Sequence, residues 1–378
     1  MDRNVPVRRR STNTQRSSLS KSKLPGATST SPQLSRILCA ERLHVRFNPE
    51  VTPLTTLLAS PSFLARHSTD ILQAWPDLET LALPANADDR LSAEACATID
   101  IAYFSGDVFP ALSRPYWAAM DAATNLRWVH VFNAGIDNPV FKRLLDRGVR
   151  LTTSSGSTAK PIAQTAIAGM LMLSRPFLYW ANQQRAHSWE PVRGSAIPAD
   201  LDGQTLTVVG LGPIGTEITR LGKAIGLRTV GVRRSPSAPG DSVDELVHPS
   251  NLATVLPRTD WLALACPLTQ ETRHLINAEA LALLPRGARV VNIARGEVVD
   301  EAALIDALRS GHIAGAYLDV FAREPLPADS PLWDMPNVII SPHNSAAALG
   351  NDARATAIFL RNLAAYRLGS PLENETRA

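Results

Sequence analysis

Two series of short apolar runs, separated by amphipathic stretches, cover the chain from about residue 40 onward. Runs of about four to eight apolar residues predict buried strands, whereas apolar positions repeated every three or four residues predict helices. Alternation of the two kinds favours βαβ units around parallel sheets. The first series predicts five strands: RLHVRF (42–47), LETLAL (78–83), IDIAYFS (99–105), LRWVHVF (126–132) and VRLTTSS (149–155).

One long helix is predicted for the apolar stretch at 161–186, which leads to the second series. The clearest later helix is DEAALIDALRSG, with Asp300 as the expected N-cap and Gly311 as the expected terminator. The second series predicts six strands: TLTVVG (205–210), RTVGV (228–232), WLALAC (261–266), ARVVNIA (288–294), IAGAYLDV (313–320) and NVIISPH (337–343).

The composition narrows the class of protein. Of the 378 residues, 45% are hydrophobic and 19% charged, which is typical of a globular protein, and the length favours two domains. The net charge is only +3, so we expect no nucleic-acid partner. Every apolar run is shorter than the roughly 18 to 20 residues that span a bilayer, so we expect no membrane segment.

The first 38 residues differ from the rest. They hold eight Lys or Arg, one acid and few apolar residues, so they cannot bury enough surface to offset the entropy of ordering. We expect a disordered tail there, and a transit peptide remains the alternative. The three cysteines, Cys39, Cys96 and Cys266, lack the spacing of a zinc site or disulfide framework. We therefore expect no metal, and we expect a reducing, cytoplasmic location.

A glycine fingerprint, GLGPIG, follows the strand at 205–210 and opens a helix at Ile214. In such a turn Gly210 allows the tight bend, Gly212 lets the backbone approach a pyrophosphate, and Gly215 allows the helix to pack closely on the strand. The phosphates would lie at the positive end of the helix, beside Pro213 and Ile214. A glycine-rich turn without a ligand is the alternative.

The coenzyme is indicated by Arg233, which stands 18 residues after Gly215. A site for NAD places an acid near this position, where it accepts hydrogen bonds from the ribose 2′-hydroxyl. A guanidinium instead suits a 2′-phosphate, and Arg234 and Ser235 add further donors. The sequence therefore predicts NADP(H), with NAD possible, unless the arginines merely solvate a loop.

Three chemically versatile residues follow strands of the second series: Arg295, Glu324 and His343. Ligands bind beyond the carboxyl ends of parallel strands, so these side chains should converge beside the coenzyme. Reduction of a 2-keto acid needs a cation for the carboxylate and carbonyl, and a proton donor whose protonated form a carboxylate can stabilise. Taken singly, each residue could instead be a turn, solvent-facing or strand-end residue.

The motifs GLGPIG, CPLTQETRHLIN, VNIARGEVVDEAAL, LDVFAREPLP and SPHNSAA, in this order and spacing, resemble the D-isomer-specific 2-hydroxyacid dehydrogenase family. The resemblance implies a catalytic trio of Arg295, Glu324 and His343. It also implies that Asp319 bonds the nicotinamide carboxamide. The loop VFNAGID would hold the substrate carboxylate through Asn133, Ala134 and Gly135. Further coenzyme contacts are assigned to strand-end residues: Cys266, Pro267, Ile293 and Ala294.

The resemblance further implies two doubly wound, Rossmann- or flavodoxin-like α/β domains with parallel sheets and a cleft between them, and a homodimer. We expect residues 39–157 with 344–378 to form the substrate domain and 158–343 the dinucleotide-binding domain. The chain departs from the family pattern at Ala163-Gln164 and at Asn344-Ser345, whose side chains would face the substrate. Formate dehydrogenases of this superfamily carry Gln where this chain has Glu324, which disfavours formate as substrate.

Two functions fit these observations. The first is an oxidoreductase that transfers a hydride between NADP(H) and a small 2-keto or 2-hydroxy acid, most simply in glyoxylate or hydroxypyruvate reduction. The second is a nucleotide-sensing interaction protein that resembles the C-terminal-binding corepressors. Turnover of a keto acid by the purified protein would distinguish them.

Overall fold

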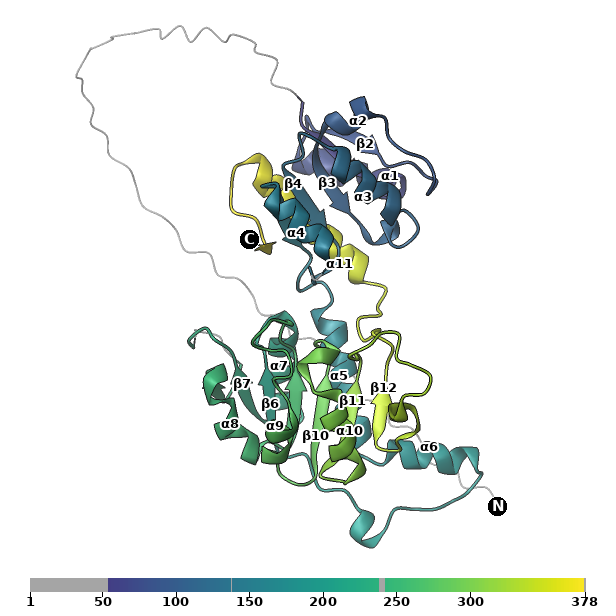
Figure 1. Cartoon of the computed structure of the whole chain (residues 1–378), viewed down its shortest axis with the longest axis vertical. Helices are drawn as coiled ribbons and strands as arrows, with labels where there is room; N and C mark the ends of the chain where they lie inside the picture. Colours follow the sequence, from purple (N-terminus) through teal and green to yellow (C-terminus); the bar gives the residue numbers. More distant parts are fainter. Residues whose placement is uncertain (1–53, 137, 238–241, 377–378) are drawn as a thin grey trace, which may run out of the picture. The chain divides into compact units, whose positions relative to one another are not determined.

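The computed structural model describes residues 54–136, 138–237 and 242–376. Their strands form two mostly parallel sheets with interleaved helices (Figure 1), which confirms the α/β class. The expected tail at 1–38 and the strand expected at 42–47 lie outside the described residues.

The first sheet has six strands in the order β13-β5-β4-β3-β1-β2. All are parallel except β13, which pairs antiparallel with β5. The parallel strands follow the 2-1-3-4-5 order of flavodoxin-like folds. The strands are β1 Thr56–Ala59, β2 Glu79–Ala82, β3 Ile99–Phe104, β4 Trp128–Val131, β5 Arg150–Thr153 and β13 Glu375–Thr376. Their helices are α1 Pro61–Ala74, α2 Ala93–Ala97, α3 Ser113–Ala122, α4 Pro139–Asp146 and α11 Asn351–Arg367.

The second sheet has seven parallel strands in the order β12-β11-β10-β9-β6-β7-β8. This is the 3-2-1-4-5-6 order of dinucleotide-binding folds with one strand added. Successive strands are added on one side of β6 up to β8 and on the other side from β9 onward, so the strand order reverses between β6 and β9. The strands are β6 Thr205–Val209, β7 Arg228–Val232, β8 Glu245–Val247, β9 Trp261–Leu264, β10 Ala288–Asn292, β11 Ile313–Leu318 and β12 Val338–Ile340. Their helices are α5 Ala159–Ser174, α6 Phe177–Arg185, α7 Pro213–Ala224, α8 Leu252–Val255, α9 Ala278–Leu283 and α10 Glu301–Arg309.

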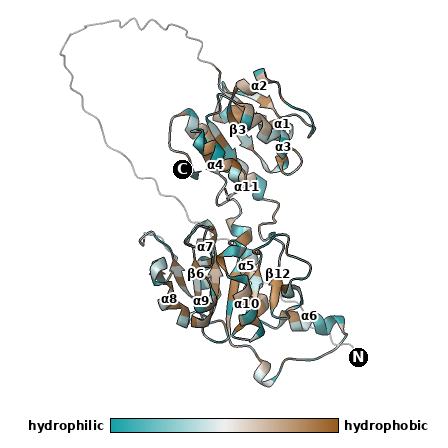
Figure 2. Cartoon of the chain, in the orientation of Figure 1, coloured by the Kyte–Doolittle hydropathy of each residue, from teal (hydrophilic) through white to brown (hydrophobic). Residues whose placement is uncertain are grey.

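Both faces of the second sheet are covered, because alternate residues of its strands belong to different cores. In β9, Leu262 and Leu264 lie in one cluster, whereas Trp261 and Ala263 lie in the other. Continuous apolar runs are what a parallel sheet buried on both faces requires. Figure 2 shows hydrophobic positions along strands such as β6 and β12, whereas helix α6 is largely hydrophilic.

The prediction of one long helix at 161–186 is wrong. Helix α5 ends at Ser174 and α6 begins at Phe177, with Arg175 in an extended conformation (φ −119°, ψ 149°) between them. Pro176 explains the break, because its ring disfavours helical backbone at the preceding residue and it has no N–H to donate. The helix at 300–311 is confirmed: Asp300 accepts a hydrogen bond from Ala303 N, and Gly311 has a φ of 68°.

Three short strands were not predicted. Strand β1 is fully buried, but its sequence TLLA is rich in Leu and lacks the β-branched apolar residues that mark strands. Strands β8 and β13 are three and two residues long and lie at sheet edges, so they carry little pattern. No helix in the described ranges is long and apolar enough to cross a membrane.

Candidate active site

The glycine turn after β6 depends on missing side chains. Gly210 has a φ of 96°, and a Cβ there would stand 2.7 Å from the backbone N and Cα of Cys266 at the end of β9. A Cβ on Gly215 would stand 1.9 Å from the carbonyl oxygen of Gly210. Both positions must therefore be glycine for α7 to pack against this turn, which lies where the strand order reverses.

Gly212 is different, because a Cβ there would meet nothing within 4 Å. It is the N-cap of α7, a helix of 12 residues, and it offers no side chain to cap the helix. The first-turn residues Pro213 and Ile214 follow it. Open space beside the N-terminus of a helix suits an anion, because N–H groups and the helix dipole point there. These residues fit the pyrophosphate of a dinucleotide.

The residues after β7 form a cationic loop. The Arg233 guanidinium donates to the carbonyl oxygens of Ser235 and Pro236, at 3.1 and 2.6 Å, so it contacts its own loop. Arg234 and Ser235 are exposed. The pKa of Glu271 is lowered, first by the Thr269 hydroxyl and further by the charge of Arg234. Arg233 thus serves the loop, and its binding of a 2′-phosphate stays a prediction.

Other predicted coenzyme contacts lie at the carboxyl ends of β9 and β10. Cys266, Ile293 and Ala294 are buried, and Pro267 is exposed. Burial raises the pKa of the Cys266 thiol to about 11, so the thiol stays protonated at neutral pH and is not a nucleophile.

Arg295 follows β10 in a turn that Asn292 clasps. The Asn292 amide donates to Arg295 O at 3.0 Å, and its oxygen accepts from Ala294 N at 3.1 Å. The next residue, Gly296, could not carry a Cβ, which would stand 1.8 Å from the carbonyl carbon of Phe321. The turn that carries Arg295 is therefore packed directly on the loop that leads to Glu324.

Glu324 and His343 form a close pair. One carboxylate oxygen of Glu324 accepts from Phe321 N at 3.1 Å, and the other lies 2.8 Å from His343 Nδ1. No described residue bonds His343 Nε2, and the side chain is half exposed. A carboxylate at Nδ1 requires the proton there, which leaves Nε2 as the ring nitrogen that can exchange a proton with a ligand. Of the predicted trio, the structure brings Glu324 and His343 into contact and places Arg295 on the adjoining turn.

Asp319 is buried beneath His343. Its carboxylate accepts hydrogen bonds from Ser341, Asn344 and Ser345. The Ser345 side chain is therefore turned toward Asp319, contrary to the expectation that it faces a substrate, whereas Asn344 is exposed. The predicted contact of Asp319 with a nicotinamide carboxamide is untested.

The predicted substrate loop lies at the carboxyl end of β4, in the first sheet. The Asn133 amide donates to the carbonyl oxygen of Gly135, and Asn133 O accepts from Ser154 N at 3.1 Å. Ala134, between them, is exposed. The loop is thus closed on itself, with backbone open at its tip, and its binding of a carboxylate stays a prediction.

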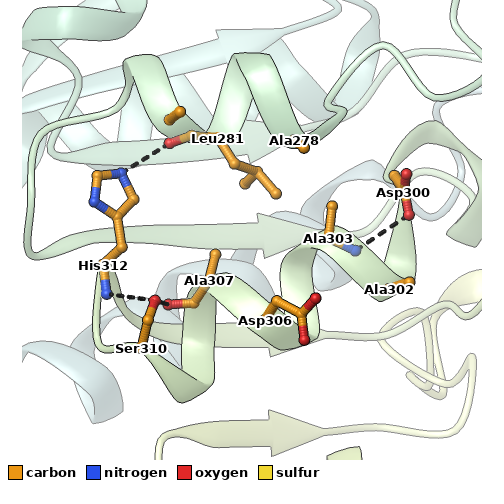
Figure 3. A pocket seen from close by; sticks show the side chains of 10 residues that line it. Ala278, Leu281, Asp300, Ala302, Ala303, Asp306, Ala307, Ser310 and His312 are labelled. Carbon is orange, nitrogen blue, oxygen red and sulfur yellow. Dashed lines mark hydrogen bonds between the residues drawn. The ribbon is translucent and has the colours of Figure 1, made fainter.

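A groove of about 560 Å³ lies between α9 and α10 (Figure 3) and includes none of these site residues. In Figure 3 the His312 ring points to the carbonyl oxygen of Leu281, and Asp300 caps α10 at Ala303. Five of the ten residues that line it are alanine, and the polar side chains of Asp300 and His312 already hold hydrogen bonds to the backbone. No cluster of three or more metal-ligating side chains occurs among the residues that the structure describes.

The chain is similar to known proteins. Residues 167–345 match the model of the D-isomer specific 2-hydroxyacid dehydrogenase, NAD binding domain. A glyoxylate reductase of Korarchaeum cryptofilum is 35% identical over 257 residues, which cover 66% of this chain and 75% of that protein. The chain belongs to the D-isomer-specific 2-hydroxyacid dehydrogenases.

Solved structures agree. A family member from Xanthobacter autotrophicus Py2, in complex with NADPH and MES, is 30% identical with a TM-score of 0.68, over 86% of this chain and 98% of that one. An NADPH-dependent glyoxylate/hydroxypyruvate reductase from Sinorhizobium meliloti, in complex with NADP and sulfate, is 27% identical with a TM-score of 0.66, over 85% and 98%. This 2-hydroxyacid dehydrogenase is thus an oxidoreductase of CH–OH groups that uses a nicotinamide coenzyme.

Sequence reasoning missed the side chains that hold the dehydrogenase site together. Asn292, Ser341 and Ser345 bond the backbone or carboxylates behind the trio. Glu301 accepts a hydrogen bond from Ala322 N at 3.0 Å and so fastens the loop before Glu324 to α10. The only signal for them in the sequence was that all four lie within the motifs VNIARGEVVDEAAL and SPHNSAA.

Proposed function

We propose that this 2-hydroxyacid dehydrogenase reduces small 2-keto acids, glyoxylate or hydroxypyruvate, and prefers NADPH to NADH. The observation that carries the proposal is the contact of 2.8 Å between Glu324 and His343 Nδ1, which leaves Nε2 without a hydrogen-bond partner among the described residues. A neutral-pH proton donor backed by a carboxylate is what carbonyl reduction requires. The keto-acid substrate is supported by relatives that are named glyoxylate reductases.

In this mechanism, bound NADPH supplies the hydride that reaches the keto carbon. His343 gives its Nε2 proton to the keto oxygen, and Glu324 stabilises the imidazolium before transfer and holds the ring afterwards. Arg295 binds the carboxylate and polarises the carbonyl through its guanidinium. Backbone N–H groups at Asn133, Ala134 and Gly135 hold the same carboxylate.

The preference for NADPH is supported by Arg233 and Arg234. They place two cations at the position where a site for NAD has an acid, and such an acid would repel a 2′-phosphate. In the structure Arg233 bonds carbonyl oxygens of its own loop. A phosphate would replace those neutral acceptors with charged ones, which bind a guanidinium more strongly. The proposed coenzyme site is lined by the glycine turn and by five residues that follow strands of the same sheet: Cys266, Pro267, Ile293, Ala294 and Asp319.

The proposal extends to organisation. Residues 39–157 with 344–378 would bind the keto acid, and 158–343 the coenzyme. The division of the described strands between two sheets supports this assignment. A cytoplasmic homodimer is proposed, with support from the free thiols of Cys96 and Cys266 and from exposed aromatic side chains at Phe177 and Trp180. Light scattering on the purified protein tests the dimer.

The test is a panel of glyoxylate, hydroxypyruvate and pyruvate, each with NADPH and NADH. We expect turnover with the two small oxo acids and a higher kcat/KM for NADPH. NADPH binding without turnover of any keto acid would contradict the reductase and favour the nucleotide-sensing interaction protein.

A further inference from the structure

His130 is a buried titratable residue that the proposed mechanism does not use. It lies in β4 and is 0% exposed. Burial lowers the pKa of its imidazole to about 3, so the ring is neutral at neutral pH. Both ring nitrogens have partners on the neighbouring segment of chain: Nδ1 lies 2.6 Å from Thr152 Oγ1, and Nε2 lies 3.0 Å from Ser154 Oγ. The ring therefore joins β4 to the carboxyl end of β5.

The direction of these hydrogen bonds follows from Trp128. Its indole N–H, which can only donate, bonds Thr152 Oγ1 at 2.8 Å. The Thr152 hydroxyl then satisfies its own hydrogen by donating to His130 Nδ1, so the neutral ring carries its one proton on Nε2. In this tautomer His130 donates to Ser154 Oγ. A chain of buried hydrogen bonds thus runs from Trp128 through His130 to Ser154.

Ser154 supports the predicted substrate loop, residues 133–135. Its backbone N donates to Asn133 O at 3.1 Å and to Val131 O at 3.0 Å. Ser154 is itself 0% exposed, and His130 bonds the hydroxyl of the same residue whose N–H holds the loop. The position of Asn133 O therefore depends on where His130 holds Ser154.

The bond at Asn133 O sets the direction of the next donor in the loop. The peptide between Asn133 and Ala134 is trans, and in a trans peptide the C=O and N–H groups point in opposite directions. Because Asn133 O is turned toward Ser154, the N–H of Ala134 is turned away from it. Ala134 is exposed, so its N–H lies at the open tip of the loop, where a carboxylate can accept from it.

Packing alone does not require a histidine at this position. An imidazole buried in a core needs a partner for each polar nitrogen, whereas an apolar side chain needs none. The other residues of β4 are apolar: Trp128, Val129 and Val131. What the imidazole adds is a rigid ring that bonds a chosen group at each end, and one of these groups belongs to the residue that orients the loop.

We propose that His130 is a positioning residue for substrate binding, which fixes Ser154 so that the N–H of Ala134 is directed outward to the carboxylate of the keto acid. The inference rests on the proposed function, in which the loop at 133–135 binds that carboxylate. His130 is buried and touches neither substrate nor coenzyme, so it acts only through Ser154.

This role has a kinetic signature. The carboxylate of the substrate does not react, so the loop binds it equally in the ground and transition states, and a displaced N–H should raise KM while kcat changes little. His130→Phe fills the space of the ring but cannot bond Ser154. We expect it to raise KM for hydroxypyruvate by about tenfold, the cost of one hydrogen bond to a charged group, with kcat within about twofold of the parent.

The experiment measures the reduction of hydroxypyruvate at saturating NADPH by the parent, His130→Phe and Ser154→Ala. Ser174→Ala is the matched control, because it removes another buried serine hydroxyl, one that bonds Leu171 O at the end of α5. We expect KM to rise in the first two variants and to stay parental in the control. NADPH affinity, measured by fluorescence, should be unchanged in all three.

Amide hydrogen exchange, followed by NMR, gives a readout that does not depend on turnover. The Ser154 N–H is bonded in the parent, so it should exchange about tenfold faster or more once His130 no longer holds the residue. The same increase is expected in His130→Phe and Ser154→Ala, and none in Ser174→Ala.

Parental KM in folded His130→Phe would overturn the proposal, and Ser154→Ala decides if His130→Phe does not fold. A fall in kcat with KM unchanged would also overturn it, because the loop would then not act in binding. A parent that reduces no keto acid would contradict the proposed function instead. The exchange rate of the Ser154 N–H then still reports on the hold of His130 on the loop, and an unchanged rate would overturn the inference.

Discussion

The turn after β6 and the segment after β12 both lie at the carboxyl ends of parallel strands of one sheet, yet they are built in opposite ways. The turn is shaped by absent side chains, since a Cβ on Gly210 or Gly215 would collide with backbone. The 341–345 segment is shaped by present ones, because the buried carboxylate of Asp319 accepts from Ser341, Asn344 and Ser345, and the Asp319 carbonyl oxygen accepts from His343 N. The glycine turn should therefore be disrupted when a side chain is added, and the 341–345 segment when a hydrogen-bonding side chain is removed.

The difference also separates the two tasks of the site. Coenzyme binding depends on open space beside Gly212 and on backbone N–H groups at the N-terminus of α7. Neither should be altered by changes in the 341–345 segment. Proton donation depends on the position of one imidazole. A change at the glycine turn should leave that position unaltered as long as the strands of the sheet keep their register. Substitutions in one region should leave the other intact, and the following variants test that separation.

The largest effect is expected for His343→Ala. Loss of a positioned general acid should lower kcat by about 100- to 10,000-fold, because the group that delivers the proton is removed. NADPH affinity should stay within about twofold of the parent, since the glycine turn is untouched. Steady-state rates and fluorescence titration measure the two. A variant with near-parental kcat would remove His343 from the mechanism.

Arg295→Ala should follow in size and differ in kind. The guanidinium binds both the ground and the transition state, so KM for the keto acid should rise and kcat should fall together. Each loss is expected at about tenfold or more, the cost of a charged hydrogen-bond partner. If KM stays at the parental value while kcat alone falls, Arg295 does not bind the carboxylate.

The glycine turn offers a matched pair. Gly215→Ala should lower the free energy of unfolding by about 1 to 3 kcal/mol, because its Cβ would meet Gly210 O at 1.9 Å. Gly212→Ala should keep the parental melting temperature, since its Cβ meets nothing, yet weaken NADPH by about tenfold if a pyrophosphate fills that space. Thermal melts and titrations decide. Unaltered NADPH affinity in Gly212→Ala would place the pyrophosphate elsewhere.

Arg233→Asp tests the coenzyme preference. Loss of a charged hydrogen-bond partner costs about 1.5 to 3 kcal/mol, so KM for NADPH should rise by roughly 10- to 150-fold while KM for NADH changes little. Arg234→Asp should likewise raise KM for NADPH more than KM for NADH, by a smaller factor. Equal effects on both coenzymes would mean that the arginines only organise their loop.

The smallest change is expected for Glu324→Gln, which keeps the shape of the side chain but removes its charge. The protonated imidazole loses its stabilising partner, so activity should be lost at lower pH on the basic side of the profile, while the acid side persists. The rate of reduction against pH, at saturating NADPH, measures the displacement. A basic limb that does not move would leave Glu324 without control of the proton donor.

The two regions also differ in how far the sequence could predict them. The glycine spacing indicated the turn after β6, because the residues that make it are the ones that the pattern contains. The pairing of Glu324 with His343 was expected and occurs in the structure. The contacts of Asp319 with Ser341 and Ser345 were not predicted, since hydroxyl groups carry no periodic signal and their partners depend on tertiary packing.

Local sequence also failed where a single residue outweighed a pattern. Pro176 divides an apolar stretch that otherwise reads as one helix. Strand β1 was missed because TLLA is short and lacks β-branched apolar residues, although it lies inside its sheet, between β3 and β2. The domain boundaries, and the assignments of Asn133 to Gly135 and of Arg233 to ligands, stay predictions, because each needs a bound molecule to test it.

The central claim is that the chain reduces a 2-keto acid with proton donation from His343. The most direct measurement mixes the purified full-length protein with NADPH and hydroxypyruvate and analyses the product by chiral chromatography. The account predicts one D-glycerate formed for each NADPH oxidised, and loss of that product in His343→Ala. Binding of NADPH with no glycerate formed, or formation of the L-isomer, would contradict it.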